Sequence, residues 1–322
     1  MSPLGARVVV VAVVAGGPGC GRIGFAAHDD AATIDAPVAA LIDAPAAAAS
    51  DCWAAWRQPT PALDPIVKLA ALDTDAMDER DPSLGDDGLT LYYDVGVAGA
   101  SYATHAYAAT RPDRDSPFAA PTDLVQLDSA DVSKLAVGGS DLEMVISAEY
   151  DGGVNDEDLW TGARGSATTP WPMPVATSTG NVNNANHQLD PQLSADALTL
   201  YYSELTPDLT SQRIMRTTRP SLHSPFAAPA VVDTGSTDSV GDPAVSPDET
   251  LLLYTERSSI AIAVSLRAST SAPWLRQGPL AAIDTPDAHD AAFTRDGCEL
   301  LFSSTRDGTY DLFEVRVTGA TP

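Results

Sequence analysis

A repeated segment constrains this chain more than any other feature. Its clearest copies are DPSLGDDGLTLYY at 81–93, DPQLSADALTLYY at 190–202, DPAVSPDETLLLY at 242–254 and DAAFTRDGCELLF at 290–302. A degenerate copy, KLAVGGSDLEMVI, occupies 134–146. The copies start 53, 56, 52 and 48 residues apart, and a nearly fixed period of about 50 residues is the signature of a repeat architecture. The chain therefore contains five similar structural units.

A second motif follows the same period. TRPDRDSPFAAP at 110–121 and TRPSLHSPFAAP at 218–229 are almost identical, and the Pro-aromatic pairs start at positions 117, 170, 225 and 273. Within each unit the apolar runs are short and are bounded by Asp, Gly and Pro, which is typical of strands and tight turns. Because no long amphipathic helix interrupts them, we expect about four strands per unit.

Five units of four strands predict an all-β fold, a single β-propeller with five blades, with six blades as the alternative. The fifth copy, which starts at Asp290, lacks room for its own outer strand. Residues 60–80 precede the first copy and contain the apolar segment 66–72. We therefore expect this N-terminal segment to complete the last blade and close the ring, which removes an exposed sheet edge.

The pattern D-P-x-L-S-x-D-G-x-x-L-x-F, followed by a D-L-(W/F) strand, resembles the TolB-type, WD-repeat-like propellers of bacterial envelope proteins. The likeness covers about residues 60–318. It implies a propeller fold and an envelope location. TolB-type propellers usually have six blades, and TolB itself carries an additional N-terminal domain for which this chain has no room.

The N-terminal residues predict export. Residues 1–19 contain an arginine, the apolar run 8–15 and small residues, which is the form of a signal peptide. Cys20 resembles the lipidated cysteine of bacterial lipoproteins, with an ordinary signal peptide cleaved nearby as the alternative. Residues 20–59 are rich in Ala, Asp and Pro, which predicts a disordered tether. The propeller then occupies 60–322. We expect a lipoprotein that faces the periplasm or the cell surface, anchored in the outer membrane.

The charge excludes some partners. The chain has 18 Lys and Arg residues against 44 Asp and Glu residues, a formal net charge of −26. Nucleic acid is therefore not an expected partner, because binding a phosphate backbone needs clustered basic residues. We expect contact with a membrane only through the N-terminal lipid, and a monomer whose partner is an envelope protein or a glycan.

Four aspartates occupy the first position of their repeats: Asp81, Asp190, Asp242 and Asp290, with Lys134 in the equivalent place of the degenerate copy. This spacing predicts a ring of carboxylates around the central channel. No motif identifies a cofactor, but calcium is a candidate ligand of the four aspartates because it prefers oxygen donors. Equivalent positions in a repeat favour a structural role, since a catalytic acid and base need different environments.

Two further predictions concern particular residues. Cys52 and Cys298 are predicted to form a disulfide in an exported protein, with a small buried thiol at Cys298 as the alternative. The acidic turn at 151–158 is the least repetitive surface together with 181–187, so Asp156, Glu157 and Asp158 are the candidate binding residues, with a solvated loop as the alternative.

Catalytic motifs such as G-x-S-x-G, H-E-x-x-H and C-x-x-C are absent from the sequence. The sequence therefore predicts a protein that is not an enzyme, a tethered propeller that binds a protein or a glycan. The alternative is a carbohydrate-active enzyme of glycosidase type that uses the carboxylates of the central channel, because glycoside hydrolysis requires a pair of acidic residues.

Overall fold

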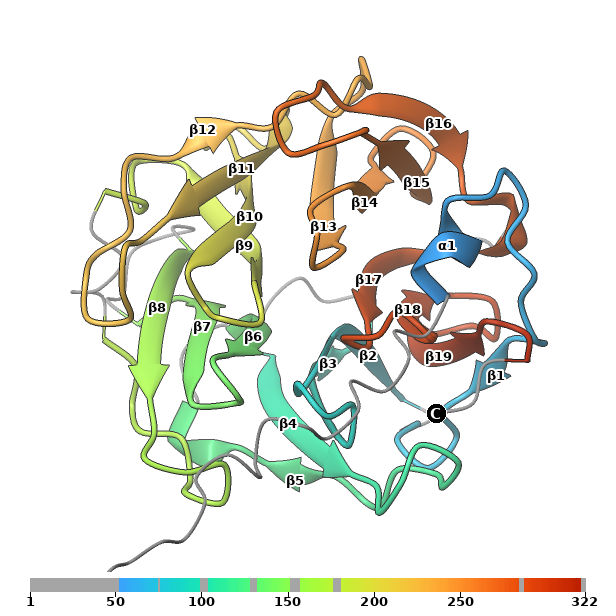
Figure 1. Ribbon diagram of the computed structural model, residues 1–322. Coiled ribbons are helices and arrows are strands. Elements are labelled where there is room, and N and C mark those ends of the chain that lie inside the picture. The colour runs from blue at the N-terminus through green and yellow to red at the C-terminus, as the bar shows by residue number, and fades with distance from the viewer. Residues whose placement is uncertain are drawn as a thin grey trace, which may run out of the picture. The chain divides into compact units, whose positions relative to one another are not determined.

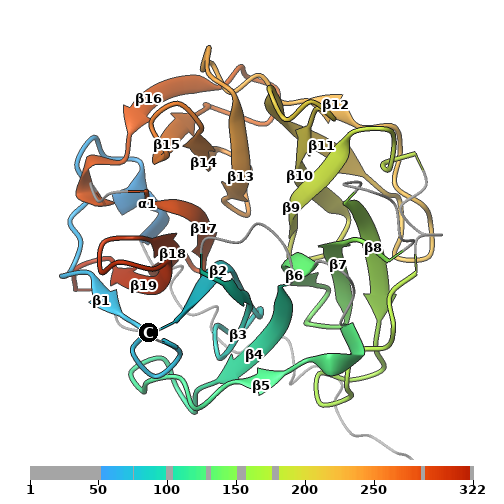
Figure 2. The same cartoon turned by 180° about the vertical axis from the view of Figure 1, so that it is seen from behind.

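The computed structural model describes residues 52–74, 76–98, 104–127, 132–150, 157–175, 181–283 and 287–319. In this part of the chain, five antiparallel sheets are arranged around one axis (Figures 1 and 2). The five-bladed β-propeller predicted from the repeat is confirmed.

The blades are numbered in chain order, and the strands of each blade are given from the innermost to the outermost. Blade 1 contains β2 (Met77–Leu84), β3 (Thr90–Val97), β4 (His105–Thr110) and β5 (Thr122–Asp123). Blade 2 contains β6 (Val132–Gly138), β7 (Glu143–Ala148) and β8 (Asp158–Ala163). Blade 3 contains β9 (His187–Leu193), β10 (Thr199–Leu205), β11 (Gln212–Thr218) and β12 (Ala230–Val231). Blade 4 contains β13 (Val240–Val245), β14 (Leu251–Glu256), β15 (Ala261–Leu266) and β16 (Leu275–Pro279). Blade 5 contains β17 (His289–Phe293), β18 (Glu299–Ser304), β19 (Asp311–Arg316) and, from the N-terminal side, β1 (Val67–Lys68).

Blade 2 departs from the predicted four strands. Its sheet has three strands, and the outer strand is reduced to a bridge between Thr161 and Val175. Pro172 and Pro174 directly precede this bridge. Because proline has no N–H to donate, these residues cannot extend the ladder.

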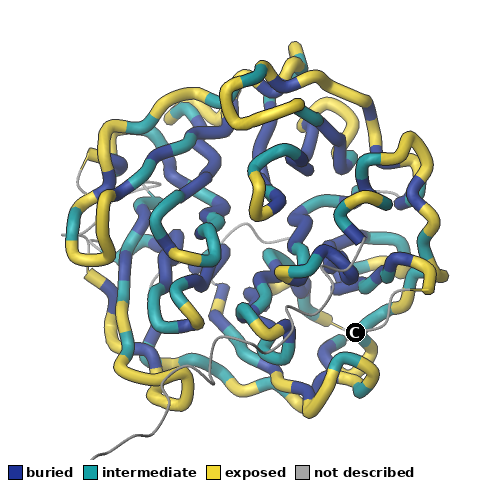
Figure 3. The backbone as a smooth tube through the Cα atoms, in the orientation of Figure 1, coloured by how far each residue is buried: buried dark blue, intermediate teal, exposed yellow. Residues whose placement is uncertain are grey.

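The second strand of each blade is buried almost throughout, since neighbouring blades cover both of its faces. All six residues of β14 and all six of β18 are buried. This explains why LTLYY and LLLY are continuous apolar runs and do not alternate with polar residues. Figure 3 shows the buried strands surrounded by an exposed outer rim.

The N-terminal segment closes the ring as predicted. In β1, Val67 pairs with Glu314 and Lys68 pairs with Phe313 of β19, antiparallel. The backbone N–H of Leu69 continues this ladder by donating to the carbonyl of Leu312, at 2.9 Å. The last blade therefore combines strands from both ends of the propeller sequence.

The folded part begins earlier than position 60. Helix α1 (Cys52–Trp56) packs on blade 5, where Cys52 forms a disulfide with Cys298, with the two Cα atoms 5.0 Å apart. The buried indole of Trp56 donates a hydrogen bond to the carbonyl of Gly297, at 2.6 Å. The expected disordered tether therefore cannot extend to residue 59; its earlier part lies outside the described residues.

The second sequence motif forms an arginine–aromatic contact in four blades. In each blade, the guanidinium of the arginine lies over the aromatic ring that follows the repeated proline, between 3.9 and 4.8 Å from the ring centroid. Each arginine also donates to the carbonyl of a residue in the turn between the first two strands of its blade. The pairs are Arg111 with Phe118, Arg164 with Trp171, Arg219 with Phe226 and Arg267 with Trp274.

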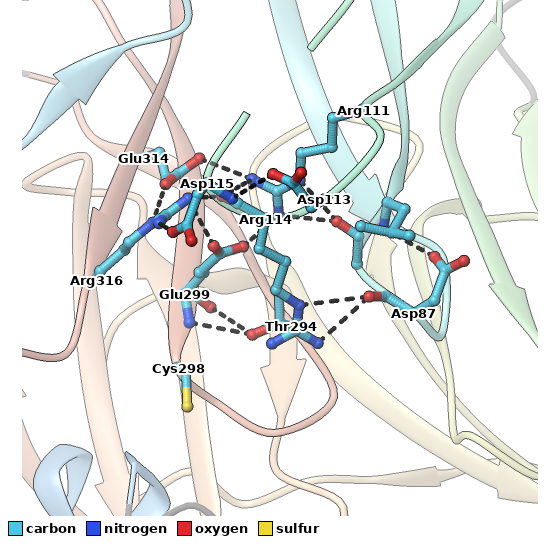
Figure 4. Close-up of polar contacts among 12 residues, drawn as sticks. Asp87, Arg111, Asp113, Arg114, Asp115, Thr294, Cys298, Glu299, Glu314 and Arg316 are labelled. Carbon is cyan, nitrogen blue, oxygen red and sulfur yellow. Dashed lines mark hydrogen bonds and ion pairs between the residues drawn. The ribbon is translucent and has the colours of Figure 1, made fainter. Parts of the chain in front are cut away.

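Charged groups also join the first blade to the last. Arg111 of blade 1 contacts Glu299 of β18 and lies 3.4 Å from Glu314 of β19. Arg316 lies 2.9 Å from Glu299 and 3.1 Å from Asp115 (Figure 4). Because Arg111 and Glu299 are almost completely buried, their ion pair must stay intact to avoid an uncompensated buried charge.

Among the described residues, no helix is long and apolar enough to cross a membrane.

Candidate functional site

The aspartates that begin the repeats meet near the propeller axis. Oxygen atoms of Asp81, Asp190 and Asp290 all lie within 4.8 Å of one another, and the same holds for ligand atoms of Asp242, His289 and Asp290. The first three residues come from blades 1, 3 and 5. The structure thus brings together the four carboxylates that the sequence predicted to face one channel.

A local backbone feature places these side chains. Each of the four aspartates has a positive φ, between 51° and 55°. The ladder between the first two strands of its blade shifts register at that point, which marks a β-bulge. Asp tolerates the left-handed region better than most residues, and bulges redirect side chains next to functional sites. Lys134 of blade 2 lacks the positive φ, although its ladder also shifts register.

The surroundings of the ring are not symmetric. The position after the repeated apolar run lies on the second strand of each blade and is buried in all five. It carries a hydroxyl in four blades but a carboxyl in the first: Asp94, Ser147, Ser203, Thr255 and Ser303. The residue before the ring position also varies, and it is charged or titratable only in blades 1 and 5, as Arg80 and His289.

Asp81 and Asp94 form a carboxyl pair in blade 1. Burial, together with the charges of Asp290 and Asp94, raises the pKa of Asp81 well above its usual range. Burial and the charge of Asp290 raise the pKa of Asp94 to about 7, although Arg80 opposes this. Their side chains are hydrogen-bonded to each other, and two carboxyl groups can share such a bond only if one holds a proton. This pair therefore stores a proton at neutral pH.

Asp290 has the opposite character. Burial opposes ionisation, but the adjacent His289 lowers the pKa of Asp290 below its usual range. Although burial disfavours the imidazolium, Asp290 raises the pKa of His289. The two residues form an ion pair, and Ser303 donates a hydrogen bond to Asp290 Oδ2 at 3.1 Å. Asp290 is thus an ionised carboxylate.

Asp190 is the third carboxyl group of the cluster formed with Asp81 and Asp290, and its environment favours the protonated form. Burial and the charge of Asp242 raise the pKa of Asp190 well above its usual range. Gln212 Nε2 donates to Asp190 Oδ2 at 3.4 Å. Lys134 partly offsets the negative charge near Asp81, Asp190 and Asp290. Its ammonium group is buried and has no hydrogen-bond partner.

A cavity of about 410 Å³ lies along the axis beside this cluster and is lined by residues of all five inner strands. The ring aspartates do not line it, whereas the residue after each of them does: Pro82, Pro191, Pro243 and Ala291. Lys134 lines the cavity, and its positive charge also acts on the carboxyl group of Asp81. The carboxylate cluster therefore lies next to the cavity, one residue before its lining on the inner strands of blades 1, 3, 4 and 5.

The site thus combines protonated and ionised carboxyl groups within a few ångströms. Groups whose environments separate their pKa values in this way can act as an acid and a base in one reaction.

The sequence pattern could not distinguish the four aspartates from one another, and the sequence analysis did not identify Asp94 or Arg80 as residues of the site. A signal for Asp94 was present, because it breaks the hydroxyl pattern of the other four copies.

A second acidic cluster lies where the ring closes. Asp73, Glu79 and Asp311 have oxygens within 4.8 Å of one another, and Lys68 of β1 lies 2.9 Å from Asp73 and 2.8 Å from Asp311. Burial raises the pKa of Glu79 to about 7, helped by the charges of Asp311 and Asp73. Because a lysine already occupies this cluster, we assign it to ring closure.

The remaining predicted residues are placed as follows. Cys20 and Asp156 lie outside the described residues. Asp158 begins β8, and the carbonyl of Glu157 accepts a hydrogen bond from the N–H of Gln188 at 2.7 Å. This contact ties Glu157 to the start of the inner strand of blade 3.

Stability should depend on pH because of the Asp81–Asp94 pair. The folded state holds a proton that the unfolded chain releases near pH 4, so the free energy of unfolding should fall as pH rises from about 4 to 7. Asp94→Ser, which introduces the residue found in blades 2, 3 and 5, should flatten this decline and stabilise the protein at pH 8 by about 2 kcal/mol. Urea unfolding at several pH values measures both effects. An equally steep decline in the variant would show that the proton is not held by the Asp81–Asp94 pair.

No protein-family model matches the chain, and no curated protein sequence matches it. Solved structures do match. An alpha-L-arabinofuranosidase from Lactobacillus brevis aligns with a TM-score of 0.55 and 11% identity, over 78% of this chain and 94% of that one. An alpha-L-arabinofuranosidase from Podospora anserina, in complex with cellotriose, aligns with a TM-score of 0.53 and 13% identity, over 78% and 94%. TolB from Acinetobacter baumannii aligns with a TM-score of 0.42 and 11% identity, over 79% and 55%.

These comparisons correct the functional prediction. The two neighbours that align with a TM-score above 0.5 are alpha-L-arabinofuranosidases, which hydrolyse glycosides. The prediction of a non-catalytic module that is not an enzyme was therefore wrong, whereas a glycan as partner agrees with the neighbour solved in complex with cellotriose. It rested on the absence of known catalytic motifs and on the symmetry of the repeat. Symmetry in sequence did not produce equal environments, because Asp94 and His289 make the carboxylates of blades 1 and 5 unlike.

Proposed function

We propose that this protein is a glycoside hydrolase that uses the carboxylates on the propeller axis. The observation that carries the proposal is the coexistence of protonated Asp81 and ionised Asp290, whose oxygens lie within 4.8 Å, beside an axial cavity of about 410 Å³. Glycoside hydrolysis requires one protonated and one ionised carboxyl group. The fold shared with the two arabinofuranosidases supports this reaction class.

The two carboxyl groups have separate roles. Asp81 is the general acid, because it is the most exposed of the four ring aspartates and because Asp94 supports its protonated form. It would donate its proton to the glycosidic oxygen as the bond to the anomeric carbon breaks. Asp290 supplies the carboxylate that stabilises the positive charge developing at the sugar, and His289 keeps it ionised. Lys134 limits the net negative charge of the site.

The substrate class is proposed from the same comparison, as a glycan with terminal pentose residues. The test is incubation of the full chain with 4-nitrophenyl α-L-arabinofuranoside, 4-nitrophenyl β-D-xyloside and arabinoxylan. Release of nitrophenol or of free pentose above the uncatalysed rate is expected. The anomeric configuration of the first product, read by NMR, then shows whether Asp290 acts on water or directly on the sugar. Absence of release from all three substrates would contradict the proposal.

We propose in addition that calcium competes with protons for the carboxylate ring. Oxygens from three blades lie close enough to share one cation, and Asp81 Oδ1 has no hydrogen-bond partner. Lys134 opposes the cation, so binding should require ionisation of Asp81 and Asp190. Millimolar calcium should therefore raise Tm more at pH 8 than at pH 5, by the linkage that stabilises a ligand-bound folded state. Equal concentrations of magnesium are the control, and an unchanged Tm at pH 8 would argue against a calcium site.

A further inference from the structure

The axial cavity has an aromatic wall that does not belong to the repeat. Trp53 of α1 and Phe293 at the end of β17 both line the cavity. Their ring centroids are 4.8 Å apart with an interplanar angle of 65°, and both side chains are partly exposed. In the described part of the chain, α1 is the only α-helix, and no blade has an equivalent of it. The fold thus brings a tryptophan from outside the repeat to the propeller axis.

Several contacts fix α1 in this position. The disulfide between Cys52 and Cys298 joins its first residue to blade 5, and Trp56 bonds to Gly297. Beyond the helix, Arg57 reaches blade 4, where it lies 2.7 Å from Asp248 and donates to Thr250 at 2.8 Å. These contacts hold the helix across the ends of blades 4 and 5.

Trp53 itself packs on a glycine. Gly297 has a φ of +72°, and a Cβ built there would lie 2.6 Å from Cδ2 and Cε2 of the indole. A larger residue would therefore push Trp53 away from the blade and change its position in the cavity wall. The turn in blade 5 thus both requires a residue that tolerates positive φ and supports the indole from behind.

The polar lining complements the aromatic wall. Lys134 is 97% buried, and its ammonium group has no hydrogen-bond partner although it borders the cavity. A buried charged donor without a partner is costly unless a ligand or water accepts its hydrogen bonds. Because the ionised Asp290 already interacts with the charge of Lys134, the group that it binds should be a neutral oxygen and not an anion.

We propose that this cavity binds a neutral sugar ring, with Trp53 as the residue on which the ring stacks and Lys134 as a donor to its hydroxyl groups. The choice of a sugar rests on the proposed function; the stacking role of Trp53 rests on the cavity alone. The Cys52–Cys298 disulfide acts as the positioning element of this subsite, because it anchors the helix that carries Trp53. Binding should therefore be weakened by reduction.

The test is isothermal titration of xylotriose and cellotriose into the oxidised full chain. Trp53→Ala should weaken binding about tenfold, which corresponds to the loss of one good aromatic contact. Trp53→Phe should retain most of the affinity. The matched control is Trp160→Ala, which removes a partly buried tryptophan of blade 2 that packs on Tyr150 and does not line the cavity.

A second arm keeps the test independent of the Trp53 substitutions. Cys52→Ser/Cys298→Ser, measured well below its Tm, should bind as weakly as Trp53→Ala. Equal affinities of the wild type and Trp53→Ala, or no binding of either trisaccharide at millimolar concentration, would overturn the proposal. Binding that depends on Trp53 without any hydrolysis would instead contradict only the proposed catalytic function and leave the sugar subsite standing.

Discussion

Asp290→Asn should reduce glycoside hydrolysis by about 10²- to 10⁴-fold, the range expected when a positioned carboxyl group is lost from a proton-transfer or charge-stabilising role. The amide has nearly the same shape but no charge, so it cannot stabilise the positive charge at the sugar. It also removes the partner of His289, whose pKa should then fall because burial disfavours the imidazolium. Initial rates on the 4-nitrophenyl glycosides measure the effect.

The control for this variant is Asp208→Asn. Asp208 is an exposed turn residue that bonds to Thr206 and Thr210 and is absent from the cavity lining. It should leave kcat/KM unchanged. Thermal unfolding of both variants separates a catalytic loss from misfolding. If Asp290→Asn keeps both its fold and its full activity, the assignment of Asp290 is wrong.

Loss of the disulfide should produce the largest change in stability. Cys52 and Cys298 are separated by 246 residues, and in the chain-entropy model a loop of this length contributes about 5 kcal/mol by restricting the unfolded chain. Cys52→Ser/Cys298→Ser should therefore lower the free energy of unfolding by up to about that amount. Guanidinium unfolding, monitored by tryptophan fluorescence, measures the change.

The same measurement on reduced wild-type protein provides a control, because it should coincide with that on the double variant. The ring remains closed by β1 and by the buried ion pair of Arg111 and Glu299, so the variant should still fold. A change below about 1 kcal/mol would mean that β1 and Trp56 already restrain the N-terminal segment in the unfolding reaction. In that case, the effect of the disulfide would be limited to holding α1 in place on blade 5.

The repeat predicted the architecture for a simple physical reason. A strand that is buried on both faces must be apolar throughout, and a turn that needs Asp, Gly or Pro leaves the same residues in every copy. Position 81 and its three equivalents could thus be recognised as one structural site, and 66–72 could be assigned to the last blade because that blade lacked a strand. The four arginine–aromatic pairs were visible as a motif, but their contacts were not.

Local exceptions to the repeat were harder to interpret. The prolines at 172 and 174 removed one outer strand, and Cys52 with Trp56 placed a helix where composition predicted a disordered tether. His289 directly precedes Asp290, but consecutive residues of a regular strand point to opposite faces of the sheet, so adjacency alone did not predict an ion pair between them. The ladder of blade 5 shifts register at this point, and there the two side chains meet.

By itself, then, the sequence determined the five blades, the closure of the ring and the convergence of four aspartates on one axis, because these follow from periodicity and from the pairing needs of strands. Only the tertiary structure decided which aspartates hold a proton. A carboxyl pKa depends on burial and on charges contributed by other blades, and the charges around Asp81 and Asp290 come from residues up to about two hundred positions away. Position in a repeat is a property of the chain, whereas protonation is a property of the assembled ring.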